Sequence, residues 1–161
     1  MALVTSQSTL PDFEHEYHTV IVDTISDSSK QKFTSYFPTP LENIVQVQLI
    51  AAHIDNHNAS ELIHLKIDEL KTIFSQRGKT DLETSDDNII NGVFGTLITD
   101  GTTRLVFKNE YAVIQQYYNP IRKLDRLNVE VLKETGADVT FTTGETCLIF
   151  RFICKKRNMS Y

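Results

Sequence analysis

The residues best suited to metal chemistry in this chain are His53, Asp55 and His57, which stand at alternate positions. Alternate side chains of an extended strand point to the same side, so two imidazoles and a carboxylate could face one ion. Histidine, aspartate and asparagine are also common in a polar turn that follows a strand, where short polar side chains bond to the nearby backbone. We favour the turn interpretation and expect no metal or other cofactor.

No other pattern of an active site is complete. Asp86-Asp87-Asn88 resembles part of a calcium loop but lacks the glycine and the closing glutamate. Gly92 and Gly95 are not followed by the helix that a phosphate-binding loop requires, and Gly-x-Ser-x-Gly does not occur. We expect His64 on the solvent side of a strand. The sequence therefore predicts a protein that is not an enzyme.

The stretch 117–127 has the composition of a contact surface, because it combines aromatic side chains, a proline and charges of both signs. Its alternative role is structural: Tyr117 and Leu124 would pack on the protein's own core while the charges stay in water. The two roles are compatible. The candidate interface residues are Tyr118, Asn119, Pro120, Arg122 and Asp125.

Most of the chain alternates between apolar and polar residues with the period of two that indicates strands. The clearest cases are 63–68, where Ile, Leu and Ile alternate with His, Lys and Asp, and 148–152. Eight or nine such segments separated by short turns predict an all-β protein of antiparallel strands, either a sandwich or a barrel.

Breaks between the strands are expected at several places. Residues 25–35 are polar and predict a loop, and both Phe37-Pro38-Thr39-Pro40 and Asn119-Pro120 predict interruptions. Asp100-Gly101 predicts a hairpin. One helical turn is expected at Leu70, Ile73 and Phe74, closed by Gly78.

Length and composition indicate one domain. The chain has 161 residues, 40% hydrophobic and 23% charged, with a net charge of −5. We expect a flexible arm at 1–14, one β domain at 15–155 and a tail at 156–161. The acidic balance argues against specific nucleic-acid binding, although the tail begins with a basic run. We expect neither a signal peptide nor a membrane span.

The two cysteines, Cys147 and Cys154, are expected to stay reduced. In one extended strand they would lie about 23 Å apart, which is far beyond the reach of a disulfide. A reducing compartment is the expected environment.

The run from Tyr118 to Gly136, YNPIRKLDRLNVEVLKETG, resembles a segment of the single jelly-roll capsid proteins of large eukaryotic DNA viruses, virophages and Polinton-type elements. In that family an Asn-Pro loop leads into a Leu-Asp-Arg-Leu strand and then an acidic, glycine-bearing turn. The stretches 37–52, 65–70 and 90–98 are similar to earlier strands of the family. The resemblance covers about residues 17–154, although His64 stands where the family often has an aromatic residue.

The resemblance implies that the domain at 15–155 is an antiparallel eight-stranded single jelly-roll sandwich with a structural role in the virion. The expected protein is a penton, the subunit of the five-fold vertex of an icosahedral shell, which self-associates into a homopentamer beside the major capsid protein after synthesis in the host cytoplasm. One alternative is a minor capsid or cement protein. Another is a carbohydrate-binding jelly-roll module, although the chain has no tryptophan for a sugar platform. A cupin-type metalloenzyme based on His53, Asp55 and His57 would lack a matching second ligand pair.

Overall fold

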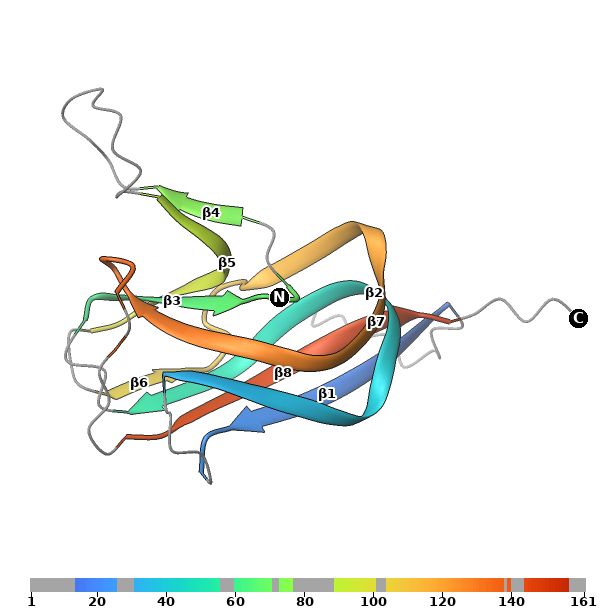
Figure 1. Ribbon diagram of the computed structural model, residues 1–161, viewed down its shortest axis with the longest axis horizontal. Coiled ribbons are helices and arrows are strands. Elements are labelled where there is room, and N and C mark those ends of the chain that lie inside the picture. Colours follow the sequence, from blue (N-terminus) through green and yellow to red (C-terminus); the bar gives the residue numbers. More distant parts are fainter. Residues whose placement is uncertain are drawn as a thin grey trace, which may run out of the picture.

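The computed structural model describes residues 14–25, 31–55, 60–70, 73–76, 89–100, 104–137, 139 and 144–156. The described residues form strands and no helix, which confirms the all-β prediction (Figure 1). The strands are β1 (His15–Asp23), β2 (Lys32–Asp55), β3 (Leu62–Ile67), β4 (Ile73–Gln76), β5 (Ile89–Ile98), β6 (Arg104–Phe107), β7 (Ile114–Lys133) and β8 (Thr146–Lys155).

Two long bent strands organise the molecule. β2 has 24 residues and β7 has 20, and both turn back at the right-hand end of Figure 1. The first part of β2 pairs with β7, from Lys32 opposite Glu130 onward. Its later part pairs with β8, from Ile44 opposite Cys154 to Ile54 opposite Thr146. Each bent strand therefore belongs to two different parts of the sheet.

All pairings are antiparallel, and the strand order is β1-β8-β2-β7-β3-β5-β4, with β6 beside β2. The bends divide this order into two layers. The first layer contains β1, β8, the later part of β2, and β6. The second contains the first part of β2, the later part of β7, β3, β5 and β4. Such an order, with strands that pass from one layer to the other, is that of a jelly-roll type sandwich.

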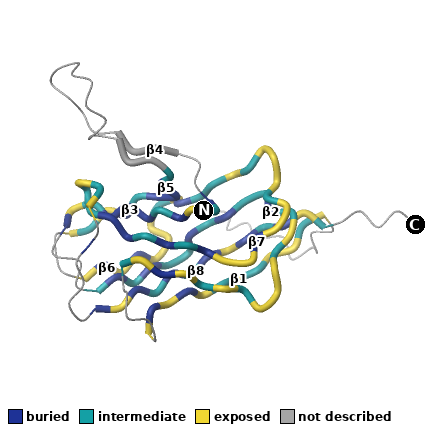
Figure 2. The backbone as a smooth tube through the Cα atoms, viewed as in Figure 1, coloured by how far each residue is buried: buried dark blue, intermediate teal, exposed yellow. Residues whose placement is uncertain are grey.

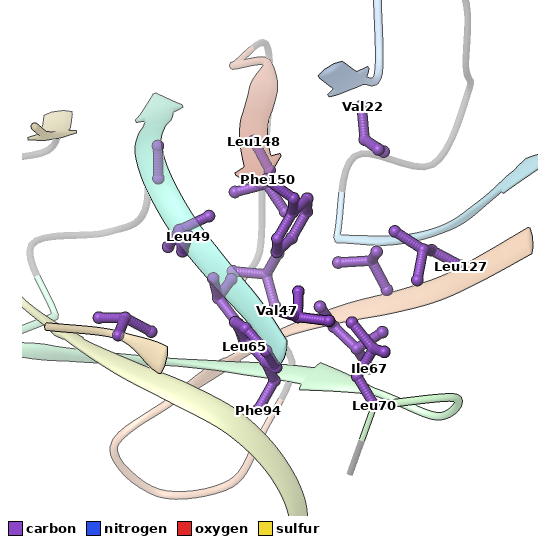
Figure 3. Close-up of a cluster of buried hydrophobic side chains, with 14 of the residues drawn as sticks. Val22, Val47, Leu49, Leu65, Ile67, Leu70, Phe94, Leu127, Leu148 and Phe150 are labelled. Atoms are coloured by element: carbon purple, nitrogen blue, oxygen red, sulfur yellow. The ribbon is translucent and has the colours of Figure 1, made fainter. Parts of the chain in front are cut away.

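The two layers enclose one apolar core. Figure 3 shows side chains from both layers converging, among them Leu49, Leu148 and Phe150 from the first and Leu65 and Phe94 from the second. The rings of Phe94 and Phe150 meet edge to face with centroids 5.7 Å apart. Phe37 and Phe152 make a similar contact at 6.1 Å. Such pairs add roughly 0.5–1.5 kcal/mol to the free energy gained by burial.

One side of the sandwich is closed by the segment that leads into β7. Ile98 N donates to Tyr111 Oη at 2.7 Å, and Gln115 Nε2 donates to Phe94 O at 2.8 Å. Leu49 N donates to Val113 O at 2.9 Å. This segment therefore bridges β5 of the second layer and β2 of the first.

Prolines do not end the long strands, contrary to the sequence prediction. β2 continues through Pro38 and Pro40, and β7 continues through Pro120. The ladder between β2 and β7 is interrupted near these residues, with register shifts between Tyr36 and Leu41 and between Ile44 and Gln46. A proline at an interrupted register costs no ladder hydrogen bond, and the irregularity helps the strand to bend.

Three local predictions are wrong. The helical turn does not form, since Ile73–Gln76 is strand β4 paired with β5. The predicted loop 25–35 ends early, because β2 starts at Lys32. The hairpin at Asp100-Gly101 is wrong because β5 pairs with β3 and β4 while β6 pairs with β2, so the chain changes layers between them. Gly78 and Gly101 lie outside the described residues.

Candidate interaction surface

The bends of β2 and β7 lie side by side and form a projecting end of the molecule, which we call the corner: residues 37–44 and 117–126. Leu41 pairs with Leu124, and Ile44 pairs with Ile121. Asn43 turns β2 here with a φ of 53°, a left-handed conformation that asparagine tolerates better than most residues. The corner brings together Phe37–Pro40 and Tyr118–Pro120, which are about 80 positions apart in the sequence.

The corner exposes all the predicted interface residues. Tyr118 is 100% exposed, and Asn119, Pro120, Arg122 and Asp125 are exposed as well. Figure 2 shows the exposed positions along both bends. A fully exposed tyrosine leaves its ring in water, so this end of the molecule presents apolar surface that a contact would bury. That these residues contact a partner stays a prediction.

Tyr117 and Leu124 attach the corner to the core of the sandwich. Tyr117 Oη donates to the carbonyl oxygen of Leu70 at 3.1 Å, and burial raises the pKa of this tyrosine well above its ordinary value. The Leu124 side chain is buried with 2% of its surface exposed. Tyr117 and Leu124 therefore pack on the core as the structural alternative predicted, while their neighbours remain available for contact.

A groove of about 680 Å³ lies between the corner and the ends of β1 and β8. It is lined by Glu16, His18, Thr39, Pro40, Leu41, Glu42, Asn43, Lys123, Cys154, Lys155 and Lys156. Burial, followed by the charge of Glu16, raises the pKa of Cys154 to about 11, so its thiol stays protonated at neutral pH. Because lysines and carboxylates are mixed along the groove, its charge does not select one class of ligand.

The outer surface of the first layer carries several exposed apolar side chains among polar ones. Tyr17, Ile21 and Ile25 are 57%, 62% and 65% exposed at or just after β1, and Val106 of β6 is 48% exposed. Ile149 and Ile153 of β8 are only half-buried, and they pair with Ile21 and Tyr17. These exposed apolar residues were not predicted from the sequence. Their signal was that β1 and β8 carry apolar residues on both faces instead of one.

The outer surface of the second layer combines paired charges with two exposed apolar residues, Tyr36 of β2 (72%) and Ile98 of β5 (66%). Glu130 of β7 binds Lys32 of β2 on one side and Lys66 of β3 on the other, the latter at 2.5 Å. These two lysines hold the pKa of Glu130 below its ordinary range. Beside this row, Asn128 donates to the Glu69 carboxylate through its backbone N at 2.8 Å.

The metal candidates do not form a site in the described residues. His53 and Asp55 lie on the outer side of β2, flanking buried Ile54, while His57 lies outside the described part of the chain. Arg104 Nε donates to His53 Nε2 at 2.9 Å, which occupies that nitrogen's lone pair. Across the described residues, no three His, Cys, Asp or Glu side chains come together where they could hold a metal ion.

The prediction that His64 faces solvent is wrong. Only 3% of its surface is exposed, and its Nδ1 lies 2.8 Å from Thr96 Oγ1. β3 is paired on both edges, with Thr96 of β5 and Leu132 of β7 opposite His64. Leu132 is itself buried, so the outer side of this strand is covered and the imidazole serves as a satisfied core residue.

Cys147 and Cys154 are both free thiols, as their spacing predicted. The described residues include no helix that is long and apolar enough to cross a membrane. No protein-family model matches the chain, and no curated protein sequence matches it.

Proposed function

We propose that the protein is a structural capsid subunit, a penton of the five-fold vertex of an icosahedral shell. Five copies would associate with one another and with the major capsid protein, in a virion assembled in the host cytoplasm. The observation that carries the proposal is the presence of two separate exposed apolar regions: the first layer exposes Tyr17, Ile21 and Val106, and the corner exposes Tyr118.

A soluble monomer rarely leaves several large apolar side chains exposed on one surface, so this surface favours a protein contact. The corner supplies a second, separate surface centred on fully exposed Tyr118. Closed rings are built from heterologous contacts, in which one surface of a subunit meets a different surface of the next. Two distinct surfaces on one rigid sandwich are what a five-fold ring requires.

The resemblance of 118–136 to capsid proteins supports the same role, because that run forms nearly all of the β7 part of the corner and the later part of β7. A jelly roll alone does not decide function, since the fold serves viral capsids, lectins and cupins alike. The proposal therefore stands on the fold, the resemblance and the exposed surfaces together. We propose that its contribution is geometric and that it carries no catalytic group.

The mass of the purified protein in solution, measured by light scattering after size exclusion, tests the penton role. A particle of about five times the 18.4 kDa chain is expected, and electron micrographs should show five-fold rings. A chain that stays below pentamer size at every concentration up to the millimolar range would overturn the penton role and leave the minor capsid or cement role in its place.

A carbohydrate-binding module is the second candidate. The fully exposed ring of Tyr118 favours it, because sugar rings stack on exposed aromatic faces. Glycan-array screening of the wild type against Tyr118→Ala separates the two functions. Binding that is lost in the variant would support the module, while an array without signal would leave the capsid role alone.

A further inference from the structure

The outer face of the second layer carries a row of side chains that contact one another across neighbouring strands. The first part of β2, the later part of β7 and β3 lie side by side (Figure 1). Thr34 of β2 lies opposite Asn128 of β7, and Tyr36 lies opposite Arg126. Glu69, in the turn just after β3, lies on the other side of Asn128. We call these five residues the platform.

The polar side chains of the platform hold one another in place. Thr34 Oγ1 donates to Asn128 Oδ1 at 2.7 Å. Asn128 in turn donates to the Glu69 carboxylate through its side-chain Nδ2 at 2.5 Å and through its backbone N at 2.8 Å. Arg126 Nε lies 3.7 Å from Glu69 Oε1. Because these side chains are already ordered, a ligand that binds them pays little for fixing them.

The platform also has groups to offer to a ligand. Tyr36 is 72% exposed, and within the described part of the chain its side chain makes no hydrogen bond, ion pair or ring contact. The side chain of Arg126 is 52% exposed, and Glu69 is its one charged partner among the described residues. The guanidinium has further N–H donors beyond Nε. An exposed ring beside a few fixed donors and acceptors is typical of small-ligand sites.

The charges of this face indicate the chemical class of the ligand. Arg126 lies beside Glu69, and Lys32 and Lys66 both contact Glu130. Each of these cations therefore has a carboxylate beside it, and an anionic ligand would have to compete with Glu69 for Arg126. A hydroxyl group can accept from Arg126 and donate to Glu69 without displacing either charge. The platform is therefore suited to an uncharged ligand that is rich in hydroxyl groups.

We propose that the platform binds a neutral oligosaccharide, with one sugar ring stacked on Tyr36 and its hydroxyl groups bonded to Arg126 and Glu69. The carbon face of a sugar ring is apolar and packs on an aromatic ring, while its hydroxyl groups both donate and accept. The proposal rests on the outer face of the second layer and does not require the penton role. It concerns a different surface from Tyr118, which lies in the corner.

An array of neutral, sialylated and sulfated oligosaccharides tests the class of ligand. The wild-type protein should bind neutral members, and acidic members should bind no better than their neutral counterparts. An array on which nothing binds would overturn the proposal. Binding confined to the sialylated or sulfated members would overturn it as well, because the platform would then recognise negative charge.

Variants of two exposed tyrosines test the position of the site. The probe is the neutral oligosaccharide that binds most strongly on the array, and its affinity is measured by calorimetric titration. Tyr36→Ala should weaken binding by roughly tenfold or more, whereas Tyr36→Phe keeps the ring and should stay within about threefold of the wild type. Tyr118→Ala is the matched control and should leave the affinity unchanged. Loss in Tyr118→Ala with none in Tyr36→Ala would place the sugar at the corner and overturn the platform.

Arg126→Ala should also weaken binding, while the melting temperature should stay close to that of the wild type, because the side chain is half exposed. Light scattering of the Tyr36→Ala variant separates a sugar site from a contact between copies. If the variant kept its affinity for the sugar but lost particle mass, Tyr36 would serve association and the proposal would be wrong. Five-fold particles that bind no sugar would support the penton alone. Sugar binding that depends on Tyr36, in a chain that never reaches pentamer mass, would support the platform alone.

Discussion

Gly95 of β5 and Val113, just before β7, approach so closely that a Cβ atom at residue 95 would lie 2.4 Å from Val113 Cγ1. Real side chains do not tolerate this separation, so only glycine fits unless the valine moves. The contact lies where the segment leading into β7 crosses from one layer to the other. Close packing on this side of the sandwich therefore requires glycine at residue 95.

Gly95→Ala should destabilise the fold by about 1–3 kcal/mol, the usual cost of overpacking a core. Val113→Ala removes the opposing methyl groups, so Gly95→Ala should cost much less in that background. Urea denaturation of the two single variants and the double variant measures the coupling. If the losses of unfolding free energy in the two single variants add up in the double variant, the steric explanation is wrong. The effect of Gly95→Ala would then come from the conformation of the β5 backbone.

Glu130 links β2 to β3 through Lys32 and Lys66 and should give the fold a pH-dependent stability. The lysines lower the pKa of its carboxyl group in the folded state. Its contribution is therefore present above the pKa of the unfolded chain, near 4.5, and is lost as the pH falls through the lower folded value.

Glu130→Gln should lower the free energy of unfolding by about 1–2 kcal/mol at pH 7, a figure reduced because Lys32 is largely exposed. The difference from the wild type should shrink at pH 3. Urea midpoints across this pH range provide the measurement, with Glu61→Gln at an exposed residue as the control. A difference that persists unchanged at pH 3 would mean that packing, not charge, is responsible.

The two thiols should differ sharply in reactivity. Burial and the charge of Glu16 raise the pKa of Cys154 to about 11, so at pH 8 roughly one thiol in a thousand is ionised. Cys147 is half-buried on the outer side of β8, and burial and Asp23 raise its pKa as well. A disulfide reagent at pH 8 should modify Cys147 at least tenfold faster than Cys154.

Mass spectrometry of the time course identifies which cysteine reacts, and Cys147→Ser should remove the fast phase. Denaturation in urea should make both thiols react at one rate. Equal rates in the folded protein would show that the groove opens readily to solvent around Cys154.

Strands with a clean alternation were predictable, because their burial follows local sequence alone. Ile63, Leu65 and Ile67 are fully buried, as are Leu148, Phe150 and Phe152, just as the period of two indicated. Pairing partners were less predictable. The turn after β5 was assigned to a hairpin because local turn chemistry does not report that the chain crosses between layers.

The irregular parts of the long strands also escaped prediction. Val45, Val47 and Leu49 alternate with two glutamines, a pattern that would bury all three, but a register shift between Ile44 and Gln46 buries Ile44 in place of Val45. His64 was placed in solvent because alternation assumes one exposed face, whereas β3 is covered on both. The corner residues were identified correctly as exposed candidates, since aromatic, proline and charged residues together are typical of contact surfaces. The apolar edge strand was missed because its outward residues depend on which strands lie at the edge.

Charge reversal at the corner tests whether Arg122 and Asp125 serve association. Both side chains are exposed on β7, so Arg122→Glu with Asp125→Lys keeps the net charge and buries nothing new. Because surface charges contribute little to folding but much to the choice of partner, the melting temperature should change by less than about 2 °C. Association measured by sedimentation should weaken at least tenfold.

Lys108→Glu with Glu110→Lys is the matched control, since these exposed charges follow β6 and lie outside the corner. It should leave both association and melting unchanged. If the corner variant lost stability as much as association, Arg122 and Asp125 would be structural residues of the bend. The ring contact would then have to lie elsewhere, with the exposed apolar side chains of the first layer as the next candidate.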